Sequence, residues 1–214
     1  MSTNKEVREN IAIPAPKFRT AVFTIIGTAP YVQNQFSQKA REIMKAKQQA
    51  GSVANKGKKR DPKDFLANYI GAQHKTADGH NGIPASAFRT ASISACRLVG
   101  FKMTLAKLSV FIEADGFDAV DGTPLVYFTK GKPKYCEHAA RNDSGVADIR
   151  ARAMWDAGWE AKLRVRYDAD QFTLTDISNL LCRVGQQVGI GEGRADSPNS
   201  CGMGWGFFDL GDGK

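Results

Sequence analysis

The stretch Trp159–Tyr167 reads WEAKLRVRY and alternates apolar and charged residues without interruption. The apolar residues share one face of an extended chain and the charged residues share the other: Trp159, Ala161, Leu163, Val165 and Tyr167 against Glu160, Lys162, Arg164 and Arg166. Successive side chains of a strand point to opposite faces, so the pattern predicts a strand with one buried and one solvent-facing side. Such strands are typical of an antiparallel sheet that is covered on one face only.

Four further stretches carry strand patterns. Residues 18–26 (FRTAVFTII) and 107–113 (KLSVFIE) are rich in β-branched and aromatic side chains, and residues 124–129 resemble a short return strand. The glycine-rich C-terminus finishes in an aromatic run at 204–210. We therefore expect a strand in each of them.

Two stretches repeat apolar residues at helical spacing. Residues 86–99 begin with Ser86 and residues 175–185 begin with Thr175, and both residue types commonly cap helices. With residues 124–129 set aside as part of an insertion, the strands and helices follow the order strand, helix, strand, strand, helix, strand. That order predicts an α+β protein with a ferredoxin-like (βαββαβ, RRM-like) core, in which an antiparallel sheet carries two helices on one face. The other face is then free to bind a ligand.

The rest of the chain is expected to surround this core within a single domain, 1–214. Residues 1–17 predict a flexible arm, because they are polar at first and then carry two prolines. Residues 48–64 are rich in Gly, Lys and Asn and predict a mobile basic loop. Residues 114–158 predict a second long insertion, which after the expected strand at 124–129 is rich in turn residues and irregular up to Gly158.

Positive charge is concentrated between Ser37 and Lys63. The nine basic residues there are Lys39, Arg41, Lys45, Lys47, Lys56, Lys58, Lys59, Arg60 and Lys63, opposed only by Glu42 and Asp61. This surplus of seven compares with a net charge of +8 for all 214 residues. Clustered Lys and Arg release counterions from a phosphate backbone, so a single-stranded nucleic acid is the expected partner. The alternative is a solvated helix face followed by a loop.

A glycine-rich segment, Val188–Arg194 (VGIGEGR), follows the second expected helix. It does not match the dinucleotide fingerprint, because its third glycine comes one position early and the segment follows a helix, not a strand. It is either a structural turn or a backbone that approaches a phosphate or another subunit at Gly189 and Gly191, with Arg194 beside it. A near match to a phosphate-binding loop at 51–58 has the wrong spacing, which excludes nucleotide hydrolysis.

No catalytic or metal motif is evident, so we expect a non-catalytic protein without cofactor or metal. The three histidines, His74, His80 and His138, fit no zinc spacing. The chain has no apolar run of about 18 residues and no signal-peptide pattern. Its four cysteines are spread widely, which favours a reducing, cytoplasmic compartment.

The aromatic residues of the last expected strand are further candidates. Trp205 and Phe207 either pack in the core or stack on unpaired bases from the free face of the sheet. Arg164 and Arg166 add charge on one face of the central strand.

Three segments together resemble the RAMP superfamily, which includes backbone subunits of CRISPR effector complexes and related bacteriophage proteins. They are TIIGTAPYVQNQFSQKAREIMKAKQ (24–48), GIPASAFRTASISACRLV (82–99) and LTDISNLLCRVGQQVGIGEGRADSPNSCGMGWGFFDL (174–210). The resemblance is closest to phage-encoded members, covers roughly the first half and last fifth of the chain, and leaves 114–158 unmatched. It implies a ferredoxin-like core, single-stranded RNA as ligand, assembly side by side along that RNA, and a thumb-like role for 114–158. A phage-encoded protein of this kind would act in the cytoplasm of the bacterial host.

Three functions follow as hypotheses. The first is a non-catalytic single-stranded nucleic-acid-binding protein, RNA favoured over DNA, that forms homo-oligomers along its ligand. The second is a structural protein of a viral assembly. The third is a metal-independent ribonuclease, which would need a catalytic histidine such as His74 or His80.

Overall fold

The expected central strand is the middle of the sheet. The computed structural model describes residues 13–35, 38–49, 62–141, 147–197 and 202–211. Its antiparallel sheet runs β10-β1-β9, formed by β10 (Phe208–Leu210), β1 (Phe18–Gly27) and β9 (Glu160–Asp168). Residues of β9 alternate between buried and exposed as the sequence predicts, with Ala161, Leu163 and Val165 fully buried.

Two strands pair with the edge of β9 that lies opposite β1. β4 (Val110–Glu113) pairs with 164–167 of β9, and β6 (Pro124–Lys130) pairs with 160–161. Two short strands, β3 (Gly82–Pro84) and β5 (Gly116–Phe117), pair with β6. All of these pairings are antiparallel, which confirms the expected α+β class with antiparallel sheets.

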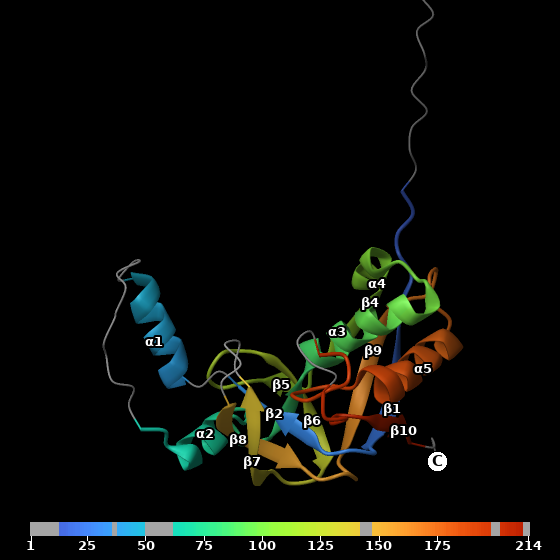
Figure 1. Cartoon of the computed structure of the whole chain (residues 1–214). Helices are drawn as coiled ribbons and strands as arrows, with labels where there is room; N and C mark the ends of the chain where they lie inside the picture. The colour runs from blue at the N-terminus through green and yellow to red at the C-terminus, as the bar shows by residue number, and fades with distance from the viewer. Residues whose placement is uncertain (1–12, 36–37, 50–61, 142–146, 198–201, 212–214) are drawn as a thin grey trace, which may run out of the picture.

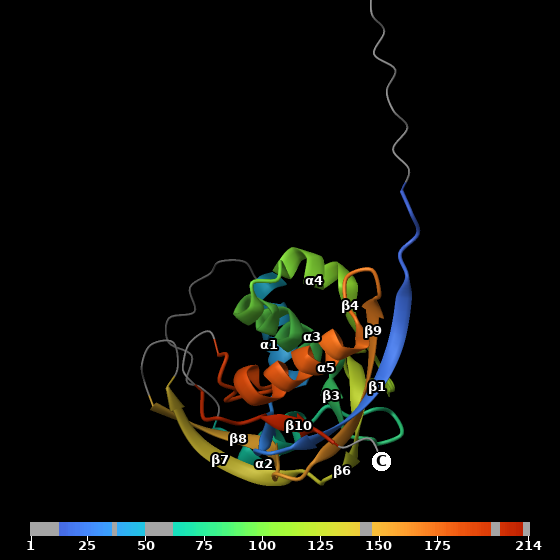
Figure 2. The same ribbon diagram turned by 90° about the vertical axis from the view of Figure 1, so that its right-hand side faces the viewer.

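Helices cover one face of this sheet. α3 (Ala85–Ala95) and α5 (Leu174–Arg183) lie side by side on it, with α4 (Met103–Ser109) beside α3. Figure 2 shows β1 at the margin of the molecule, with no helix of the described chain on the opposite face of the sheet. We call that side the open face.

A second sheet, β2-β8-β7, extends from the first. It consists of β2 (Tyr31–Gln33), β8 (Ala147–Trp155) and β7 (Lys134–Arg141), and the short helix α2 (Phe65–Gly71) packs against β8. Helix α1 (Gln38–Gln49) projects beside the body in Figure 1. No helix within the described residues is long and apolar enough to cross a membrane.

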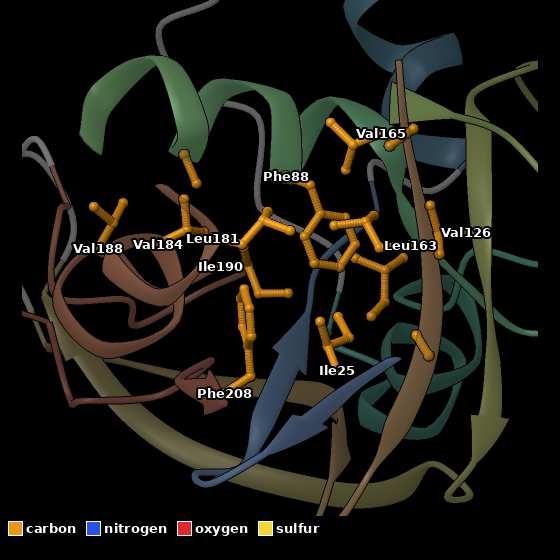
Figure 3. Packing of buried hydrophobic residues seen from close by; sticks show 14 of the residues in the cluster. Ile25, Phe88, Val126, Leu163, Val165, Leu181, Val184, Val188, Ile190 and Phe208 are labelled. Atoms are coloured by element: carbon orange, nitrogen blue, oxygen red, sulfur yellow. The ribbon is translucent and has the colours of Figure 1, made fainter. Parts of the chain in front are cut away.

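The core lies between the helices and the sheet. Figure 3 shows Phe88 of α3 and Leu181 of α5 directed toward Ile25, Leu163 and Phe208 of the strands. A second group of rings joins the two sheets: Tyr31, Phe128, Trp155 and Trp159 lie with centroids 4.6–6.1 Å apart. These aromatic pairs fix the smaller sheet against the larger one.

Three expectations about elements were wrong. The strand expected at 107–113 begins only at Val110, because α4 continues to Ser109. The strand expected at 204–210 is limited to Phe208–Leu210, since positive φ angles at Gly204 and Gly206 form turns before it. The stretch after the expected 124–129 strand, which was expected to be irregular up to Gly158, contains β7 and β8, whereas the strand at 124–129 is confirmed as β6.

The helix starts also differ from the expected caps. Thr173, not Thr175, caps α5, and it forms a reciprocal capping box with Asp176. Ser86 lies inside α3, whose N-cap residue is Pro84 without a side-chain hydrogen bond. Threonine was therefore the right residue type at the wrong position for α5, and the serine cap expected for α3 was wrong, because an apolar pattern places a helix start only to within a few residues.

Candidate nucleic-acid interface

A groove of about 1110 Å³ lies on the helical side of the molecule. One wall is α3, and the other is formed by β2 with Asn34 and by the glycine-rich segment at 188–196. Arg150 of β8 and Lys107 of α4 reach the groove from its two sides. Residues far apart in the sequence therefore meet here, including Arg194, which the sequence had singled out.

The groove carries a surplus of positive charge. Its lining includes five basic side chains and two acidic ones: Arg89, Arg97, Lys107, Arg150 and Arg194 against Glu192 and Asp196. Hydroxyl groups add to it, because Ser86, Thr90 and Ser94 recur at four-residue spacing along α3. Guanidinium, ammonium and hydroxyl groups are the usual protein donors to phosphate oxygens.

The basic groups of the groove differ in their partners. Arg97 pairs with Asp196 at 3.1 Å, and Arg150 with Glu192 at 3.5 Å. Arg194 donates a hydrogen bond to the Gly191 carbonyl at 3.2 Å. Among the described residues, neither Arg194 nor Lys107 has an acidic partner, so both are available to a bound anion.

The two glycines predicted to permit a close approach do so toward their own chain. Gly189 and Gly191 have φ angles of 72° and 79°, in the left-handed region. A Cβ atom at Gly191 would lie 2.6 Å from both the Val32 carbonyl and the Tyr31 ring. Intramolecular packing against β2 thus accounts for this glycine, and it places the groove wall.

The open face holds Arg164 and Arg166, on the opposite side of the sheet from the groove. Arg164 pairs with Asp115 at 2.7 Å and with Glu113 at 3.6 Å. Arg166 lies between two rings, 4.9 Å from the centroid of Phe18 and 5.2 Å from that of Phe111. Sequence reasoning missed both phenylalanines, because only the pairing of β1 and β4 with β9 brings them together.

The charge of the open face distinguishes it from the groove. Outward-facing positions of β1, β4, β6, β9 and β10 carry four basic and four acidic residues: Lys130, Lys162, Arg164 and Arg166 against Glu113, Glu160, Asp168 and Asp209. This balance of charges contrasts with a surplus of three positive charges in the groove. A polyanion is therefore expected in the groove.

Trp205 and Phe207 do not lie on the sheet, which corrects their expected position. Both are half-buried in the turn before β10. The Trp205 ring contacts His138 edge-on at a centroid distance of 5.3 Å. These aromatic residues hold the glycine-rich segment against the β7–β8 hairpin and are not a platform for bases on the open face.

The basic segment is described only in part. Arg41 of α1 pairs with Asp121, and Lys45 is exposed on the same helix. Lys39 and Lys47 belong to α1, but their side chains lie outside the described part of the structure, as do all of Lys56, Lys58, Lys59 and Arg60. Gln35, just before α1, follows Asn34 of the groove wall and donates to Asp118, which in turn contacts the groove-lining His74.

His74 borders the groove and is held by a buried aspartate. Its Nδ1 lies 3.0 Å from Asp118, whose carboxylate is fully buried and also accepts from Gln35, Lys75, Val120 and Asp121. Asp121 lies close enough to complete a three-residue metal-ligand group. However, the oxygens of Asp118 are already satisfied by protein donors and Asp121 is paired with Arg41, so the group does not fit a metal.

A second histidine joins the glycine-rich segment to the hairpin. Glu192 accepts from Arg152 at 2.5 Å and lies 3.4 Å from Nε2 of His138, while the buried Nδ1 of His138 has no hydrogen-bond partner among the residues that the structure describes. Burial, reinforced by Glu192 and Glu137, raises the pKa of the neighbouring Cys136 thiol. These polar contacts therefore join β7 and β8 to the glycine-rich wall of the groove.

In comparisons with known proteins, no family model and no curated protein matches this chain. The cationic and hydroxyl groups of the groove are suited to anions, and its length along α3 suits an extended ligand.

Proposed function

We propose that the protein binds single-stranded nucleic acid in the groove between α3 and the glycine-rich segment, without catalysing a reaction. The observation that carries the proposal is the difference in charge between this groove and the open face. An extended polyanion gains most from a concave, positively charged surface, because each neutralised phosphate releases counterions. Basic α1 begins four residues after Asn34 of the groove wall, and we propose that it extends the positive surface beyond the groove.

We further propose that the β1, α3, β4, β9, α5 and β10 elements form a ferredoxin-like core. The strand pairing β10-β1-β9-β4, all antiparallel with two helices on one face, supports this assignment. Together with the order of motifs along the chain, it also supports our proposal of a distant RAMP-type relationship. On that proposal the ligand is RNA and several copies assemble side by side along it, inside the cell.

Polar groups of the groove favour RNA over DNA. Ser86 and Thr90 of α3 and Asn34 after β2 offer donors and acceptors to a 2′-hydroxyl group, which is what allows proteins to tell the two polymers apart. A duplex is disfavoured, because a groove between a helix and a loop accommodates one strand more readily than two.

The experiment is a competition of unlabelled RNA, DNA and duplex against a labelled single-stranded RNA, followed by fluorescence anisotropy. We expect single-stranded RNA to compete best and duplex worst. Light scattering on the same mixtures should show several protein copies per RNA, increasing with RNA length. A preference for duplex, or oligomers that form equally well without nucleic acid, would contradict the proposal, and the latter would favour a structural protein of a viral assembly.

A second candidate is a metal-independent ribonuclease, and the pairing of His74 with Asp118 favours it. A histidine whose Nδ1–H is held by a buried carboxylate presents Nε2 as a base, and His74 borders the groove. Such a base would take the proton of a 2′-hydroxyl that attacks the adjacent phosphate, so that the P–O5′ bond breaks, a 2′,3′-cyclic phosphate forms and the leaving 5′-oxygen takes a proton from water. Cleavage of bound RNA in the presence of a chelator, abolished in His74→Gln while binding persists, would support this candidate. Intact RNA with wild-type protein would exclude it.

A further inference from the structure

One acidic side chain of the groove occupies a place suited to a phosphate. Both carboxylate oxygens of Asp196 lie near Nη2 of Arg97, at 3.1 and 3.2 Å. The hydroxyl of Ser94 also donates to Asp196. Asp196 therefore accepts from a guanidinium and a serine hydroxyl, which are the donors that commonly hold a phosphodiester.

This ion pair is exposed and easily exchanged. The side chains of Arg97 and Asp196 are 55% and 40% exposed. Exposed pairs of this kind contribute little to stability, because water and salt screen them and ordering two side chains costs entropy. A phosphate that enters the groove can thus take the place of Asp196 without disturbing the fold.

The other acidic residue of the groove is different. The side chains of Glu192, Arg152 and His138 are only 19%, 13% and 10% exposed, and they join the groove wall to the β7–β8 hairpin. Removing one partner from such a buried cluster leaves the remaining charges uncompensated, so Glu192 belongs to the fold. Of these two acidic residues, only Asp196 is both exposed and paired with groups that commonly bind phosphate.

We propose that Arg97 and Ser94 form a phosphate subsite, and that Asp196 occupies it until a phosphodiester of the bound strand displaces it. The inference rests on the proposed function, since it names one contact within the same groove. It makes Asp196 an internal competitor that lowers affinity and limits binding to ligands with a phosphate at this position.

The test uses Asp196→Asn, which keeps the shape of the side chain and removes its charge. The matched control is Asp209→Asn, at an exposed aspartate of β10 that bonds to Gln186 and lies outside the groove. The probe is a labelled single-stranded RNA, titrated over a range of salt concentrations. We expect Asp196→Asn to bind about 5-fold more tightly, the scale of one exposed ion pair, and Asp209→Asn to bind like wild type. The salt slope of Asp196→Asn should stay close to that of wild type, because the same phosphate occupies the subsite in both proteins.

Arg97→Ala tests whether Asp196 acts through Arg97. It should weaken binding, and in its background Asp196→Asn should no longer change affinity, because the two residues act on one phosphate. Equal effects of Asp196→Asn and Asp209→Asn, or an Asp196→Asn effect that persists without Arg97, would overturn the subsite alone. Failure of wild-type protein to bind RNA at any salt concentration would overturn the groove interface together with it.

Discussion

Substitution of Gly191 tests how the groove wall is built. Its φ of 79° places it in the left-handed region, where a residue with a Cβ costs about 1–2 kcal/mol. The added Cβ would also lie 2.6 Å from the Val32 carbonyl and the buried Tyr31 ring, and such overpacking costs about 1–3 kcal/mol. Gly191→Ala should therefore lower the free energy of unfolding by about 2–5 kcal/mol.

Gly204 provides the matched control. Its φ of 71° is nearly the same, but the nearest atom to an added Cβ, in the Phe207 ring, is 3.7 Å away. Gly204→Ala should cost only the backbone strain of about 1–2 kcal/mol. Asn tolerates this backbone region better, so Gly204→Asn should be milder still, whereas Gly191→Asn should keep the packing cost. Urea unfolding, followed by tryptophan fluorescence, measures the free energy of unfolding of the variants at Gly191 and Gly204. Equal losses at the two positions would refute the packing argument.

Three further predictions concern capping and titration. Thr173→Ala should lower the free energy of unfolding by about 1 kcal/mol through loss of the α5 cap, and Thr175→Ala should change it little; equal effects in urea unfolding would contradict the assigned cap. Burial alone would raise the pKa of Asp121, but hydrogen bonds from Thr123 and Arg41 lower it from 3.8 to about 2. Its contribution to stability is therefore present above the unfolded pKa of 3.8 and lost as the pH falls toward 2, and Asp121→Asn should flatten acid unfolding in that window. The raised pKa of Cys136 predicts slow alkylation by iodoacetamide at neutral pH, measured by peptide mass spectrometry; modification as fast as that of an unstructured peptide would contradict it.

Local patterns predicted the central parts of the fold. The alternation in Trp159–Tyr167 identified β9, and the β-branched run at 18–26 identified β1, because burial of one face imposes a period of two on both strands. Apolar residues at helical spacing identified α3 and α5, because each helix also buries one face. The β7–β8 hairpin was not predicted, since β7 alternates half-buried and exposed residues and the buried positions of β8 are mostly alanines between charged side chains. Such strands look like loops when only composition is read.

The candidate site was less accessible to sequence reasoning. Arg194 and the glycines at 189 and 191 stood out as a motif, but Arg97 and Ser94 appeared only as ordinary residues of a helix. His74 and Asp118 are 44 positions apart, and no spacing rule connects them. The pairing of distant segments is decided by tertiary packing, which a single sequence does not record.

The most direct test of the groove as the nucleic-acid interface compares two charge-matched variants. One is Lys107→Ala with Arg194→Ala in the groove, and the other is Lys162→Ala with Arg166→Ala on the open face. The measurement is the dependence of single-stranded RNA affinity on salt concentration. We predict that the groove variant flattens the log–log slope by about 1.4, the value for two lost phosphate contacts, and that the open-face variant keeps the wild-type slope. A flattened slope in the open-face variant with an unchanged slope in the groove variant would contradict the account.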